Sequence, residues 1–147
     1  MSKAADGRAG MLPEMTEKAI ETLSKDKNGF FLMVEGSMID WGAHEKNQEY
    51  TIDEVIDLDN AVGVAKEFAD KNGETLIVVT ADHETGGLSL VDGNIQERKV
   101  SGNFIQSGSH TGVMVPIFSY GPSAERFSGI HENTFFLNEF LNLLNIK

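Results

Sequence analysis

Two short apolar runs constrain the fold of this chain more than any other feature. Residues 30–34 (Phe-Phe-Leu-Met-Val) and 75–80 (Thr-Leu-Ile-Val-Val-Thr) are the two runs, and each ends abruptly in polar residues. Runs of this length are typical of strands buried on both faces. A helical period over residues 51–72 lies between them, and Thr51 with Glu54 forms a capping box at its start. This strand–helix–strand unit predicts a parallel sheet with a right-handed crossover.

The remaining segments add helices and a further strand. Helical spacing of apolar residues predicts helices over residues 13–25 and 135–144. Residues 115–120 predict a third strand, and residues 88–93 a short hairpin that turns at Asp-Gly. We therefore expect an α/β fold, a three-layer sandwich in which helices cover both faces of a mainly parallel sheet.

Length, charge and cysteine content set outer limits on this chain. Its 147 residues suit one domain, which we place at residues 13–147, after a flexible N-terminal segment at residues 1–12. A net charge of -11 argues against nucleic acid or an anionic membrane as the main partner. The absence of cysteine excludes disulfides and thiolate metal sites. We expect no membrane span and no signal peptide, because no apolar run approaches about 20 residues.

Acid and imidazole side chains lie in loops that a parallel sheet would gather at one edge: Glu35, Asp40, His44, Asp82, His83 and His110. Asp82 and His83 directly follow the second apolar run, where ligands bind in open α/β sheets. Asp40 and His44 are one helical turn apart, so both can face one cation. Oxygen and nitrogen ligands without thiolate suit Zn²⁺, and an all-oxygen site suits Mg²⁺. Two nearby metal ions are a known arrangement for phosphoryl transfer.

Each of these residues also has a structural interpretation. Asp82 suits turn chemistry, and Glu35 suits the cap of a neighbouring helix. Trp41 fits either core packing or the wall of a site, and Glu84 fits either an imidazole partner or a solvated loop charge. The acids of residues 49–59 suit the solvated face of a helix near its N-terminus.

Three blocks of the sequence resemble the alkaline phosphatase family. They are residues 30–44 (FFLMVEGSMIDWGAH), 75–87 (TLIVVTADHETGG), and 110–122, which contains His-Thr-Gly and Val-Pro-Ile-Phe-Ser-Tyr-Gly-Pro. The resemblance implies hydrolysis of phosphate monoesters through a phosphoserine, with two zinc ions and one magnesium ion. It also implies a periplasmic or secreted location, since members are commonly exported.

The same resemblance implies a role for each matching residue. The implied ligands are Asp40, His44 and His110 for a first zinc ion, Asp82 and His83 for a second, and Glu35 for magnesium, with Trp41 near the phosphate. The family's serine nucleophile follows an aspartate in a part of the fold that has no counterpart here, and no serine of this chain follows an aspartate. We therefore expect the C-terminal part of an alkaline phosphatase, with a partial metal site, no catalytic nucleophile and little or no turnover.

Two alternatives to this interpretation remain, one within the same superfamily and one from another class. A sulfatase, phosphodiesterase or phosphoglycerate mutase could share the Asp-His and His ligands. A non-catalytic metal-binding or structural module is the alternative from another class. An incomplete sheet would expose an edge, so we expect a homo-oligomer or poor solubility.

Overall fold

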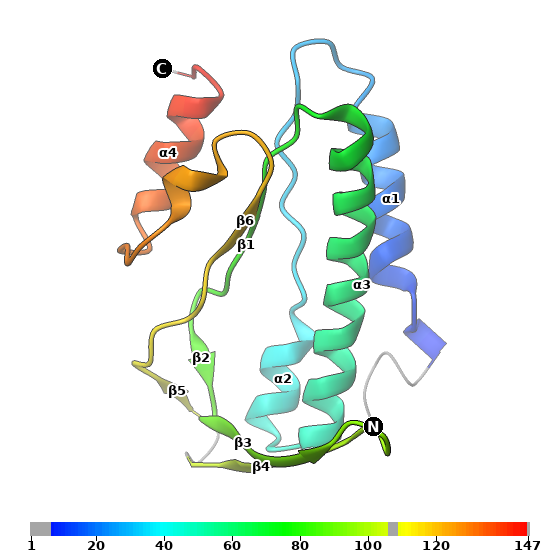
Figure 1. Cartoon of the computed structure of the whole chain (residues 1–147), viewed down its shortest axis with the longest axis vertical. Coiled ribbons are helices and arrows are strands. Elements are labelled where there is room, and N and C mark those ends of the chain that lie inside the picture. Colours follow the sequence, from blue (N-terminus) through cyan, green and yellow to red (C-terminus); the bar gives the residue numbers. More distant parts are fainter. Residues whose placement is uncertain (1–6, 106–108, 147) are drawn as a thin grey trace.

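The computed structural model describes residues 7–105 and 109–146 of the chain (Figure 1). Its helices are α1 (Met11–Leu23), α2 (Met38–His44), α3 (Gln48–Asn72) and α4 (Phe135–Leu143), with a 3₁₀ helix η2 (Ala124–Phe127). Its strands are β1 (Ile77–Val79), β2 (Glu84–Thr85), β3 (Leu88–Asn94), β4 (Lys99–Phe104), β5 (His110–Thr111) and β6 (Phe118–Tyr120). None of the described helices is long and apolar enough to cross a membrane.

Helices α1 and α3 lie side by side along the length of the molecule (Figure 1). Ile20 of α1 and Ala61 and Ala69 of α3 are buried. Small residues on α3 let the two helices approach closely, and burial of apolar area stabilises the pair at roughly 25 cal/mol per Å². The predicted helix at residues 13–25 is confirmed as α1, which begins and ends two residues earlier.

The start of α3 differs from the capping box expected at Thr51. Asn47 is the N-cap, and its side-chain oxygen accepts a hydrogen bond from the Tyr50 backbone N–H at 3.0 Å. Thr51 lies one turn inside the helix, where its hydroxyl donates to the Asn47 carbonyl at 2.9 Å. Asparagine is at least as good an N-cap as threonine, so the helix extends back to the earlier residue.

The expectation that the acids of residues 49–59 are all solvated is wrong for Glu54 and Asp57. Their side chains are only 3% and 5% exposed, and both pair with Arg8. A buried carboxylate needs a cation or hydrogen-bond donors to offset its lost hydration. Arg8, far away in sequence, supplies that charge. Residues 1–6 of the expected flexible N-terminal segment lie outside the described residues.

An extended layer lies between the helices. Strands β1 and β6 form an antiparallel pair in which Val78 is opposite Ser119. Helix α3 contacts β1 on one side, and η2 contacts both strands. Phe140 of α4 packs on Phe31 with ring centroids 5.4 Å apart. Helices therefore flank this layer on two sides, as the expected sandwich requires (Figure 1).

The expected pairing of the strands is wrong in one respect. Among the described residues, every paired strand has an antiparallel partner, so the mainly parallel sheet is not formed. Residues 30–34 run between α3 and the β1–β6 pair (Figure 1) without joining a ladder. Their burial alternates as in a strand, with Phe31 57% and Met33 68% exposed. A parallel strand–helix–strand unit requires a hydrogen-bonded backbone partner for residues 30–34, and the described residues supply none.

The hairpin of β3 and β4 is longer than predicted. Asp92 and Gly93 lie inside β3, next to a bulge, and do not form the turn. The chain turns at residues 95–98, where the Asn94 side chain accepts a hydrogen bond from the Glu97 backbone N–H at 3.1 Å. An asparagine that bonds its own downstream backbone stabilises a turn, so this turn competes successfully with Asp-Gly.

Candidate metal centre

Helix α2 presents two of the predicted ligands, Asp40 and His44. The helix packs closely on α3 because Gly42 has no side chain: an added Cβ would lie 2.9 Å from the Thr51 backbone nitrogen. The Tyr50 hydroxyl also contacts the Met38 sulfur at 3.3 Å. Because α2 packs on α3 through Gly42 and Met38, its other side presents Asp40 and His44 together, as their spacing predicts.

The short ladder of β2 and β5 brings two histidines from distant parts of the chain to α2. His110 lies directly opposite Thr85 in this ladder, and His83 precedes β2. Gly86 follows β2 with a φ of +75°, and an added Cβ would lie 3.1 Å from the Ala43 carbonyl oxygen. Glycine is therefore required both for the left-handed turn and for the close approach to α2.

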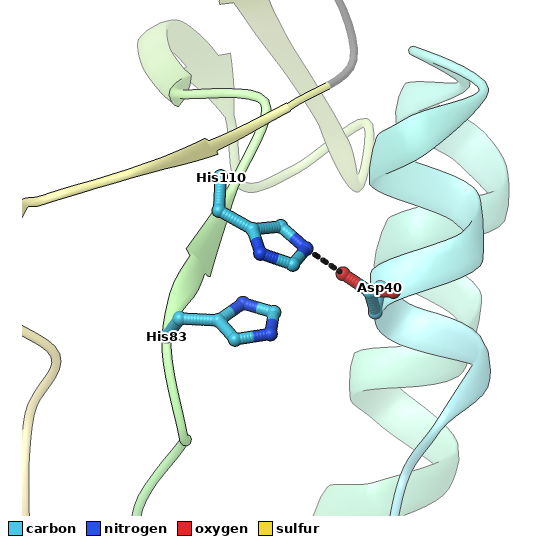
Figure 2. Close-up of side chains that lie close together, drawn as sticks. All are labelled: Asp40, His83 and His110. Carbon is cyan, nitrogen blue, oxygen red and sulfur yellow. Dashed lines mark ion pairs between the residues drawn. The ribbon is translucent and has the colours of Figure 1, made fainter. Parts of the chain in front are cut away.

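Figure 2 shows His83 and His110 extending from this ladder toward Asp40. One donor atom from each of these three residues lies within 4.8 Å of the other two. The rings of His83 and His110 stack with centroids 3.5 Å apart. The side chains of Asp40 and His110 are 37% and 45% exposed, so the cluster is accessible from solvent.

Distances around Asp40, His44 and His110 suit the ligands of one zinc ion. The three separations are 3.3 Å from Asp40 Oδ2 to His44 Nε2, 3.5 Å from Asp40 Oδ1 to His110 Nε2, and 3.2 Å between the two Nε2 atoms. With bonds of about 2.0–2.1 Å, two donors of a tetrahedral zinc ion lie about 3.3–3.4 Å apart. The residues present therefore fit a zinc ion.

The remaining predicted ligands lie at the edge of this cluster or outside it. Asp82 is 86% exposed, and its carboxylate bonds to its own neighbour, accepting from the His83 backbone N–H at 3.1 Å and lying 3.2 Å from His83 Nε2. Glu35 is exposed at the end of the extended segment, and no hydrogen bond or ion pair within the described ranges joins it to the cluster. Trp41 is 56% exposed, with its ring 6.5 Å from that of His44.

The structure adds Thr85, which the sequence interpretation did not single out, and gives Glu84 a different set of contacts. Thr85 donates a hydrogen bond from its hydroxyl to Asp40 Oδ1 at 2.5 Å. Glu84, interpreted from sequence as an imidazole partner or a solvated charge, is neither: it accepts from the Thr111 hydroxyl and, at 2.5 Å, from the Gly87 backbone N–H. Thr85 follows His83 by two residues, so an extended backbone would have placed both on one face.

The fold and the cluster of carboxylate and imidazole donors together identify this chain as an α/β protein with a candidate metal centre. A family model described as "Alkaline phosphatase" matches residues 3–102. The alkaline phosphatase of Escherichia coli K12 is 41% identical over 138 residues, covering 84% of this chain. The solved alkaline phosphatase of the Antarctic bacterium TAB5 is 40% identical, with a TM-score of 0.89 over 100% of this chain. The chain therefore belongs to the alkaline phosphatase family.

The match covers only part of these relatives. The chain spans 29% of the Escherichia coli protein and 44% of the TAB5 protein. A TAB5 variant structure with a TM-score of 0.89 is described as having magnesium bound in its M3 site. The family and the α/β fold class are thus confirmed.

Proposed function

We propose that this chain contributes the metal-binding part of a phosphate monoester hydrolase of the alkaline phosphatase type. The observation that carries the proposal is the meeting of Asp40, His44 and His110 at separations of 3.2–3.5 Å. Family membership supports the reaction class. When bound, metal ions supply Lewis-acid stabilisation of charge on a phosphoryl group. The chain's own side chains bind and orient those ions.

The division of ligands is part of the same proposal. It assigns Asp40, His44 and His110 to a first zinc ion, Asp82 and His83 to a second, Glu35 to magnesium, and Trp41 to the vicinity of the phosphate. The first set is supported by its donor separations. The second is supported by the 3.5 Å stacking of His83 on His110, which brings another imidazole beside the first set. Glu35 rests on its place in the sequence block alone.

A zinc titration of the purified chain tests this site. We expect the chain to bind zinc, and Asp40→Ala and His110→Ala each to weaken the first site by at least tenfold, because a tetrahedral site loses one of its few protein ligands. Isothermal titration calorimetry measures affinity and stoichiometry together. His131→Ala is the matched control, because the His131 ring stacks on Phe135 outside the cluster.

Two results of this titration would contradict the proposal. Zinc affinity equal to wild type in both Asp40→Ala and His110→Ala would remove the first site. A stoichiometry of one ion per chain, unaffected by His83→Ala, would remove the second site and leave the first.

Turnover tests the remaining part of the proposed function. We propose that the chain alone, with zinc and magnesium added, hydrolyses p-nitrophenyl phosphate far more slowly than the typical enzyme range of about 1–10³ s⁻¹. No serine follows an aspartate here, and positioning of a nucleophile supplies much of the rate in phosphoryl transfer. Turnover inside that range would overturn the proposed partial site.

The substrates and the cellular location are part of the same proposal. Small phosphate monoesters are the proposed substrates, and the periplasm or the external medium is the proposed location. Phosphatase activity that stays with the cytoplasmic fraction of the source cells would contradict this location.

A further inference from the structure

The two residues of β2 point to opposite faces of their ladder, and each makes a contact that bears on the metal cluster. Neighbouring strand residues alternate in direction, whereas directly paired residues share a face. Thr85 therefore shares a face with His110, and Glu84 shares the other face with Thr111. We call the face with Thr85 and His110 the ligand side of the ladder, and the face with Glu84 and Thr111 its far side.

On the ligand side, Thr85 contacts two cluster members. Its hydroxyl donates to Asp40 Oδ1 at 2.5 Å and lies 3.4 Å from His83 Nδ1. A hydrogen bond to one carboxylate oxygen fixes the plane of the carboxylate. It leaves Asp40 Oδ2 directed toward His44, 3.3 Å away. Thr85 therefore joins α2 to the ladder beside the contact of His44 with His110.

On the far side, the Glu84 carboxylate joins β2 to β5 and to the turn that follows β2. One carboxylate oxygen accepts from the Thr111 hydroxyl on β5, and the other accepts from the Gly87 backbone N–H at 2.5 Å. Charge-assisted hydrogen bonds of this kind are about twice as strong as neutral ones. The ladder pairs Glu84 with Thr111 and Thr85 with His110, and the Gly86 backbone N–H adds a bond to the Ser109 carbonyl at 2.9 Å. The side-chain bonds of Glu84 add to this short backbone pairing.

We propose that Glu84 and Thr85 are positioning residues of the metal centre: Thr85 orients the Asp40 carboxylate, and Glu84 holds β5 so that His110 faces it. This inference rests on the proposed function, because it concerns the ligands of the same ions. Neither residue is a proposed ligand. Partners that orient a metal ligand typically change metal affinity by about 10–100-fold when they are removed.

The first test compares three threonine variants of the full chain. We expect Thr85→Val to weaken zinc binding by about 10–100-fold and Thr85→Ser, which keeps the hydroxyl, to stay within about threefold of wild type. Thr22→Val is the matched control, because the Thr22 hydroxyl donates to a carbonyl within α1. Circular dichroism and thermal melting establish that each variant is folded. Thr85→Ala replaces Thr85→Val if the latter does not fold.

A spectroscopic readout separates positioning from general stability. Cobalt bound in place of zinc shows visible absorption bands that depend on ligand geometry. We expect the bands of Thr85→Val to shift or weaken while those of Thr85→Ser and Thr22→Val match wild type. Bands and zinc affinity of Thr85→Val that both equal wild type would overturn the role of Thr85.

The second test uses the contact between Glu84 and Thr111. We expect Glu84→Ala and Thr111→Val each to weaken zinc binding, and the double variant to be no weaker than Glu84→Ala alone, because both changes remove the same hydrogen bond. Additive losses, or zinc affinity unchanged in Glu84→Ala, would overturn the role of Glu84.

The controls distinguish failure of this inference from failure of the proposed function. If Asp40→Ala and His110→Ala lose zinc while Thr85→Val and Glu84→Ala bind as wild type does, the metal site stands and the positioning roles fall. If wild type binds no zinc, or Asp40→Ala binds it equally well, the proposed function falls and the positioning roles fall with it.

Discussion

The side chain of Asp70 connects two elements that are distant in sequence, α3 and β6. It accepts hydrogen bonds from the Lys66 ammonium at 2.8 Å, on its own helix α3, and from the Tyr120 hydroxyl at 2.5 Å, on β6. The Lys66 ammonium also lies 4.4 Å from the centre of the Tyr120 ring. This group of three side chains ties the end of α3 to the β1–β6 pair.

The Asp70 carboxyl gives a prediction at this scale. Its pKa is lowered from the ordinary 3.8, first by the hydrogen bond from Lys66 and then by that from Tyr120. A lowered folded-state pKa contributes stability above the unfolded pKa of about 3.9, and this stability is lost as pH falls through the folded value. We expect Tyr120→Phe to raise the Asp70 midpoint in an NMR titration. A midpoint unchanged by this variant would show that the hydroxyl does not contribute.

At the scale of elements, the β1–β6 pair depends on a close backbone approach at Gly121. This glycine follows β6 with a φ of +102°, and an added Cβ would lie 2.2 Å from the Thr75 carbonyl oxygen. Both the left-handed backbone and the contact exclude a side chain. The end of β6 can therefore pass close to the start of the second apolar run only because residue 121 is glycine.

Alanine substitution tests this approach. We expect Gly121→Ala to lower the free energy of unfolding by roughly 1–3 kcal/mol, because the strained backbone and the clash act together. Gly63→Ala is the matched control: Gly63 lies in α3 with open space around it, and alanine there should stabilise by about 0.5–1 kcal/mol. Urea denaturation measures both. Equal stability of the two variants would contradict the predicted approach.

At the scale of the whole molecule, apolar side chains remain exposed on the extended layer and its neighbours. They include Phe31, Met33, Met114, Phe118 and Ile130. Exposed apolar side chains that lie together form interaction surfaces or promote association. The net charge of -11 opposes association between copies, so added salt should strengthen it.

Self-association is the prediction that belongs to this scale. We expect light scattering to show an average mass that rises with protein concentration. Met33→Ser should reduce the rise, because Met33 is 68% exposed on the strand-like segment. Met15→Ser, at a residue 62% exposed on α1, is the matched control and should leave it unchanged. A clean monomer at all concentrations would contradict the expected homo-oligomer.

Local signals in the sequence were sufficient for several of these features. The helices α1, α3 and α4 follow from apolar spacing, which is a property of each segment alone. The one-turn spacing of Asp40 and His44 likewise predicted a pair that the structure brings to 3.3 Å. The candidate donors of the cluster are carboxylates and imidazoles, which zinc accepts as ligands, and the sequence alone was enough to select them.

Other features depended on partners that no local pattern contains. Residues 30–34 have the composition of a strand, but a strand also needs a hydrogen-bonded neighbour, and the described chain pairs β1 with β6 instead. In the sequence, Glu54 and Asp57 have the pattern of surface acids, but their pairing with Arg8 allows both to be buried. The sequence by itself determined the helices, the family and the donor types. Only the tertiary structure decided the strand pairing, the burial of those acids and the contact of Thr85 with Asp40, because each depends on residues distant in the chain meeting in space.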